Sequence, residues 1–171
     1  MFMRVLDLLT KEHALFRRLL DRLEIDLAHD EERARTELDD GLKTLLPALD
    51  RHLDIDDLVF TRPPDAPYDD GEPLAEIEEE HRAISSLREE ILYALELSSE
   101  ECTFERLRSL TMLLIDNLEE RMQMEETRLW PLYKNALSRS LDRTLSNHLE
   151  KRVKVLEKEI ERGIAAISMP F

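Results

Sequence analysis

Apolar residues recur along most of the chain at alternating steps of three and four, the spacing that lines one side of an α-helix. Short polar breaks divide this pattern, and residues 61–73, with four prolines and a glycine, interrupt it near the middle. The pattern predicts five helices: from within the first ten residues to about Ala28, from an N-cap at Asp30 to about Val59, from Pro73 to about Leu95, from a cap at Ser99 or Thr103 to about Pro131, and from about Leu141 to Ile167.

These helices predict an all-α fold. The seven-residue phasing of the apolar stripes favours an up-down-up-down four-helix bundle over about residues 5–135, with an additional C-terminal helix over about residues 141–167 packed outside it. Neither helical hairpin could bury its stripe alone, so we read residues 1–171 as one domain and residues 61–73 as a loop between two hairpins.

Polar residues stand inside several of these apolar stripes. His13 interrupts the first stripe, His52 and Asp56 the second, His81 the third and Glu125 the fourth. Each residue taken singly has an ordinary interpretation, a core histidine with satisfied ring nitrogens or a solvated helix face. His52 and Asp56, however, are four residues apart and share one side of a helix, where an imidazole nitrogen and a carboxylate oxygen can hold a transition metal.

The spacing of these residues is repeated in the second half of the chain. Arg121 and Glu125 stand as far apart as His52 and Asp56 do, and His81 corresponds to His13 to within one residue. His13 follows Glu12, and His81 likewise follows Glu80. The chain therefore reads as two copies of one unit, in which a histidine is followed by a histidine or arginine and then, four residues on, by an acid.

Composition narrows the function classes. Hydrophobic residues make up 42% and charged residues 37%, with only three glycines, a profile typical of long amphipathic helices. The net charge of −15 disfavours nucleic acid and anionic membrane surfaces as partners. The single Cys102 cannot form an internal disulfide, and Arg4 and Asp7 interrupt the first apolar residues, so we expect no signal peptide and a cytoplasmic protein.

The chain resembles the hemerythrin-like family, also called the HHE cation-binding domain. The resemblance rests on the five polar positions within the apolar stripes and on two later segments, LVFTRP and RLWP. The resemblance covers roughly residues 5–135. It implies a four-helix bundle with a non-haem di-iron centre, and a role in binding or sensing oxygen, nitric oxide or iron, without catalytic turnover. Carried over, the metal ligands are His13, His52, Asp56, His81 and Glu125, with iron as the cofactor and a small diatomic molecule as a further ligand.

This sequence departs from the family pattern in two places. Asp56 stands where the family has glutamate, and Arg121 where it has histidine. A guanidinium group has no lone pair to offer a metal. One metal would keep His13, His52, Asp56 and Glu125 as ligands, whereas the other would keep only His81 and the shared carboxylates. The sequence therefore leaves open whether the chain binds a single metal ion or none.

Two other functions stay open from the sequence. Arg121 could neutralise Glu125 and Asp56 as a metal would, leaving a metal-free bundle that serves as an interaction or regulatory module. An oxidase-like di-iron enzyme is least favoured, because those bundles use Glu-x-x-His pairs and none marks the stripes here. A second copy of the chain or another protein as partner is also open.

Overall fold

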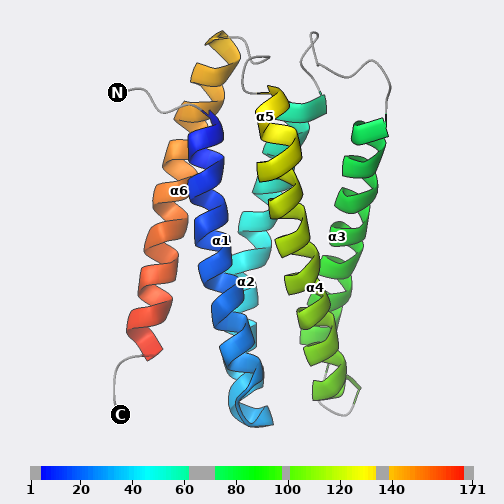
Figure 1. The fold of residues 1–171 in the computed structure, drawn as a ribbon. Helices are drawn as coiled ribbons and strands as arrows, with labels where there is room; N and C mark the ends of the chain where they lie inside the picture. The colour runs from blue at the N-terminus through cyan, green and yellow to red at the C-terminus, as the bar shows by residue number, and fades with distance from the viewer. Residues whose placement is uncertain (1–4, 62–71, 98–100, 134–138, 168–171) are drawn as a thin grey trace.

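The computed structural model describes residues 5–61, 72–97, 101–133 and 139–167, and within them every element is helical. Helices α1 (Val5–Leu27), α2 (Glu31–Asp56), α3 (Glu72–Glu96) and α4 (Phe104–Met124) alternate in direction, and α6 (Arg139–Ile167) runs beside α1 (Figure 1). The predicted all-α bundle with an extra C-terminal helix is confirmed. The middle of the predicted loop at residues 61–73 lies outside the described residues.

Two of the predicted helix starts carry side-chain caps. The Asp30 carboxylate accepts a hydrogen bond from the Arg33 backbone N–H at 3.3 Å, and Thr103 accepts one from Arg106 at 3.3 Å. Each satisfies one of the amide groups that the first turn leaves without an intrahelical partner. The sequence located both starts because aspartate and threonine stand immediately before apolar periodicity begins.

The site-bearing helices α2 and α4 both widen into a π-helical turn at their C-terminal ends. These turns are η1 (Asp57–Thr61) and η2 (Glu125–Leu129), and α5 (Trp130–Tyr133) follows η2. The Trp130 backbone N–H bonds to the Glu125 carbonyl, five residues back. The predicted end or kink near Pro131 is thus a widened turn within a continuing helix, and such turns are frequent at functional sites.

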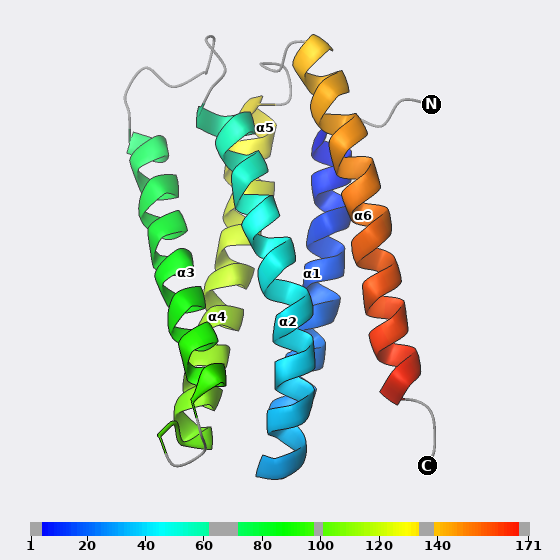
Figure 2. The same cartoon turned by 180° about the vertical axis from the view of Figure 1, so that it is seen from behind.

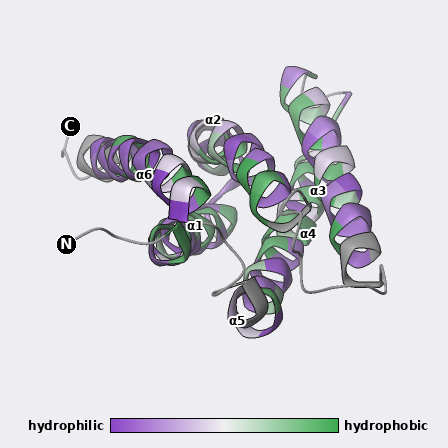
Figure 3. Cartoon of the chain, turned by 90° about the horizontal axis from the view of Figure 1, so that it is seen from above, coloured by the Kyte–Doolittle hydropathy of each residue, from purple (hydrophilic) through white to green (hydrophobic). Residues whose placement is uncertain are grey.

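Figure 3 looks along the helices and shows α1 and α2 lying between α6 on one side and α3 on the other. Figure 2 shows the same order from behind. Leucines from α1 and α2 fill the lower core, with Leu23, Leu38 and Leu42 completely buried. The two helices approach closely at Gly41, where a Cβ atom would lie 2.7 Å from Cδ2 of Leu23. Among the described helices, none is long and apolar enough to cross a membrane.

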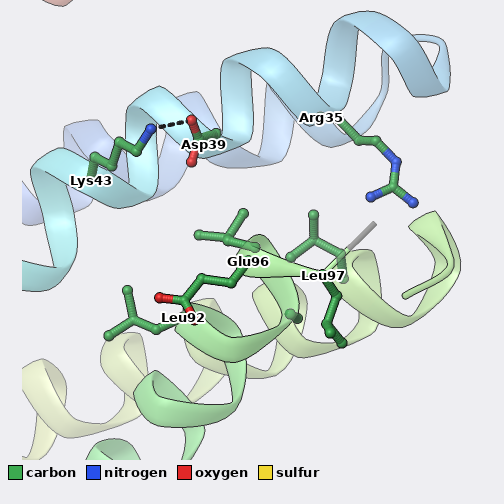
Figure 4. Close-up of a pocket in the computed structure, with 9 residues that line it drawn as sticks. Arg35, Asp39, Lys43, Leu92, Glu96 and Leu97 are labelled. Carbon is green, nitrogen blue, oxygen red and sulfur yellow. Dashed lines mark hydrogen bonds and ion pairs between the residues drawn. The ribbon is translucent and has the colours of Figure 1, made fainter. Parts of the chain in front are cut away.

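A groove of about 510 Å³ opens between α2 and the C-terminal end of α3 (Figure 4). Leucines line one wall, and the other carries Arg35, Asp39 and Lys43. These polar groups already have partners, because Lys43 pairs with Asp39 and Arg35 donates to the Cys102 carbonyl at 2.8 Å. Glu96, the charged residue that α3 adds to the leucine wall, also lines the groove.

Candidate metal centre

The five predicted ligands come from three helices and the π turn η2. His13 lies on α1, His52 and Asp56 on α2, His81 on α3, and Glu125 begins η2. Four of the five are at most 2% exposed, namely His13, His52, Asp56 and Glu125, whereas His81 is half-buried. A buried set of imidazoles and carboxylates needs positive charge or hydrogen-bond donors to offset its desolvation.

His13, His52 and Glu125 form one compact group. His13 Nε2 lies 3.2 Å from Glu125 Oε2 and 3.3 Å from His52 Nε2, and His52 Nε2 lies 3.6 Å from the same Glu125 oxygen. One ligand atom from each residue falls within 4.8 Å of the others, so a single ion could reach all three. Asp56 Oδ2 lies 3.4 Å from His52 Nε2 and adjoins this group.

Carboxylates hold the opposite ring nitrogens of both histidines. His13 Nδ1 lies 2.9 Å from Glu126 Oε1, and His52 Nδ1 lies 2.9 Å from Glu12 Oε2. An ionised carboxylate only accepts hydrogen bonds, so each Nδ1 carries the proton and donates it. In the neutral rings the lone pairs are then on the two Nε2 atoms, which face each other and Glu125, and this is the support that metal-binding histidines receive.

Each supporting glutamate is itself paired with an arginine. Glu126 receives two hydrogen bonds from Arg17, at 2.9 and 3.0 Å, and Glu12 receives one from Arg152 at 3.0 Å. Glu12, Glu126, Arg17 and Arg152 were not predicted as site residues. The glutamate before His13 was a visible signal, but the role of Arg152 was not readable, because the charged face of its helix resembles an ordinary solvated surface.

The π turn η2 brings two successive acids to His13. Glu125 faces its Nε2 and Glu126 its Nδ1, so the ring lies between adjacent residues of one turn. Trp130 closes the group, with its ring centroid 4.7 Å from that of His13.

Arg121 points into the bundle and is only 2% exposed. Its Nε lies 2.7 Å from Glu125 Oε1, its Nη2 3.2 Å from Asp56 Oδ2, and its Nη1 3.1 Å from Glu80 Oε2. The prediction that a buried Arg121 meets Glu125 and Asp56 is confirmed. Glu80, on α3, is half-buried and completes the ring of acids around the guanidinium.

His81 is directed to Arg121 and lies outside the His13–His52–Glu125 group. Its Nε2 is 2.6 Å from Arg121 Nη2, and its Nδ1 is 3.1 Å from Asp57 Oδ1. A guanidinium only donates, so Nε2 is the acceptor and the ring is neutral. Burial and the charge of Arg121 lower the pKa of His81 to about 4. Asp57, although exposed, pairs with this ring.

Buried charges shift the acids of the site in opposite directions. Burial and the nearby charge of Glu125 raise the pKa of Asp56 to about 8. Burial also opposes ionisation of Glu125, but the hydrogen bonds of His13 and His52 and the charge of Arg121 hold its pKa well below its usual value. Without metal, the two carboxylates therefore retain one proton between them.

His52 titrates in the same network. Burial lowers its pKa, but the charge of Asp56 and the hydrogen bonds to Glu12 and Glu125 outweigh burial and raise that pKa well above its usual value. Without metal, His52 is thus favoured to carry a proton on Nε2, which lies 3.6 Å from Glu125 Oε2. A metal ion at this place would displace that proton.

A second cluster of potential ligands, Asp26, His29 and Glu37, joins the ends of α1 and α2. Two guanidinium groups already occupy it. Arg22 Nε lies 2.7 Å from Asp26 Oδ1, and Arg33 Nε lies 3.0 Å from Glu37 Oε1. Because these cations compensate the acids, the cluster is a structural ion-pair network between the two helices.

Comparison with protein-family models, with curated proteins and with solved structures gave no match. The function must therefore be argued from the site's own chemistry.

Proposed function

We propose that the protein binds one divalent iron ion between His13, His52 and Glu125, with Asp56 beside them, as a hemerythrin-like binding or sensing protein. One observation carries this proposal. Two buried imidazoles, each with its Nδ1–H held by a carboxylate, direct their Nε2 atoms at each other and at Glu125. Lone pairs facing one another require a cation between them, and imidazole with carboxylate suits iron.

Arg121 takes the second cation position of the hemerythrin-like pattern. It contacts Asp56, Glu125 and His81, the residues that would otherwise be left to a second metal. A guanidinium cannot coordinate a metal and its charge repels one. We therefore propose one metal ion per chain where the family resemblance implies two.

The donor set also limits the chemistry. Two histidines and one carboxylate leave coordination positions open, and iron bound by them supplies a redox-active centre able to take a small ligand such as oxygen or nitric oxide. The surrounding residues of this chain hold the ring nitrogens, carry the counter-charge and, through Trp130, cover the His13 ring. We place no catalytic turnover on the site.

The alternative function, a metal-free regulatory bundle, has one observation in its favour. Arg121 already compensates Asp56 and Glu125, and a proton on His52 completes the balance. The two functions differ in whether metal replaces that proton.

Anaerobic titration with ferrous iron, followed by elemental analysis, distinguishes them. The chain should retain one iron, and His13→Gln should lose it. His148→Gln is the matched control, because His148 is exposed on α6. Trp130 is the only tryptophan and contacts His13, so its fluorescence gives a second signal. Absence of iron from the unaltered protein would leave the metal-free bundle as the better account. Equal retention by His13→Gln would show that iron binds at another place and would refute the proposed site.

A further inference from the structure

Helix α6 lies outside the four-helix bundle and runs along α1 and α2 (Figures 1 and 2). It buries one apolar stripe against the bundle, Leu145, Leu149, Val153, Leu156 and Ile160. Its N-terminal end is tied to α1, because the Val5 backbone N–H donates to Asp142 at 2.8 Å. A helix held only in this way would have no connection to the metal centre.

Arg152 provides such a connection. Its side chain is 12% exposed, and its Nη2 lies 3.0 Å from Oε1 of Glu12, a carboxylate only 2% exposed. The other oxygen of Glu12, Oε2, lies 2.9 Å from His52 Nδ1. One buried carboxylate therefore joins a guanidinium of α6 to a histidine of the proposed site.

This arrangement orients the Glu12 carboxylate. Its two oxygens have different partners, because Oε1 accepts a hydrogen bond from Arg152 and Oε2 lies against His52 Nδ1. An ionised, oriented Glu12 holds the proton on His52 Nδ1 and leaves the lone pair on Nε2, which faces the site. Arg152 thus acts on His52 through Glu12 and is a positioning residue.

The interface between α1 and α6 combines apolar packing with this polar contact. A groove of about 370 Å³ runs along the outer faces of the two helices, lined by Leu8, Leu15 and Val153 together with charged residues such as Lys11 and Glu150. The three apolar residues are buried, so they hold α6 against α1. The Arg152–Glu12 pair adds the connection from α6 to His52.

We propose that α6 is part of the metal site: Arg152 orients Glu12, and through it His52, so that metal binding and the docking of α6 stabilise each other. This inference rests on the proposed metal binding. Linkage makes the effect reciprocal, because a docked helix that raises metal affinity by some factor must itself be held more tightly by that factor when metal is bound.

Cobalt(II) is a suitable probe, because its visible absorption reports the ligands around it. Affinity would be measured for the unaltered protein, Arg152→Gln, Arg152→Lys and Lys151→Gln. Residues that support a ligand histidine usually change metal affinity by about 10–100-fold, and we expect about tenfold weaker binding with an altered spectrum for Arg152→Gln. Arg152→Lys keeps the charge and should recover part of the affinity. Lys151→Gln removes the same charge from an exposed neighbour and should bind as the unaltered protein does.

Hydrogen exchange tests the reverse direction, first in the unaltered chain and then in Arg152→Gln. Cobalt should slow exchange in α6 by a larger factor than in residues 84–96 of α3, which serve as the internal reference. In Arg152→Gln the two factors should become equal. If the unaltered protein binds no cobalt, the proposed function itself fails. If it binds cobalt, but Arg152→Gln binds equally well or α6 responds no more than α3, metal binding stands and the coupling to α6 is refuted.

Discussion

Removing the Arg121 guanidinium should destabilise the fold more than removing any exposed arginine. Arg121→Ala leaves Asp56 and Glu125, both fully buried, without the cation that lies 3.2 and 2.7 Å from them. Deleting one partner of a buried ion pair typically costs about 3–5 kcal/mol. Whole domains unfold at about 5–15 kcal/mol, so this loss is a large share of the stability. Glu80 is 30% exposed and can turn to water, so it adds little.

Urea unfolding in the absence of metal measures this loss. Arg128→Ala is the matched control, because Arg128 lies in η2, is 59% exposed and pairs with Glu76 at 3.2 Å. Exposed pairs of that kind contribute about 0–1 kcal/mol. If Arg121→Ala and Arg128→Ala lose the same stability, the guanidinium does not compensate buried carboxylates, and its role as a second cation must be abandoned.

Arg121→His tests the same reasoning with metal present. The new imidazole offers a lone pair beside Asp56, Glu125 and His81, so the variant should take up two iron ions, whereas we propose one for the unaltered protein. A ligand that binds only the folded state at 100 times its Kd stabilises that state by about 2.7 kcal/mol per site. The variant should therefore gain about twice as much stability from iron as the unaltered protein does. A variant that still holds one iron would show that Arg121 does not exclude the second.

Three further predictions concern single contacts. The pKa of His81 is lowered to about 4 in the folded protein, so between pH 6.5 and 4 the unfolded chain binds more protons than the folded one. The contribution of this ring to the free energy of unfolding is therefore complete above pH 6.5 and falls as the pH is lowered toward 4. In urea unfolding across that range, this part of the pH dependence should be absent from His81→Gln. Glu12→Gln should weaken metal binding by about 10–100-fold in the cobalt titration, since it removes the acceptor of His52 Nδ1; unchanged affinity would contradict the role of that acceptor. Gly41→Ala should lower thermal stability by about 1–3 kcal/mol, because the new methyl group meets buried Leu23; an unchanged Tm would mean that the helices separate at little cost.

The fold could be predicted from the sequence because its signals are local. Periodic leucines mark each helix, and Asp30 and Thr103 mark two of the starts. The π turns could not be predicted. Their hydrogen bonds depend on how α2 and α4 end beside other helices, and Pro131 indicated only that regular α-helix would not continue unchanged.

The candidate site was predictable only in part, for a similar reason. Spacing placed His52 and Asp56 on one side of a helix, and charge alone required a buried Arg121 to meet acids. Spacing within a helix does not state which neighbour a side chain will contact. His81 therefore looked equivalent to His13, although it binds Arg121, and Arg152 looked like any exposed arginine although it reaches Glu12.

Glu125 lies between two positions that can each hold a cation, and we propose a metal ion at only one of them. Its Oε1 lies 2.7 Å from Arg121 and its Oε2 lies 3.2 Å from His13, so a single carboxylate faces both cation positions. Asp56 Oδ2 is likewise shared, at 3.2 Å from Arg121 and 3.4 Å from His52. Arg121 is a permanent cation at one position, so only the other can change occupant. The negative charge that Asp56 and Glu125 share with Arg121 also favours a proton on His52, whose pKa is raised well above its usual value. A metal ion bound at this position, as we propose, would displace that proton.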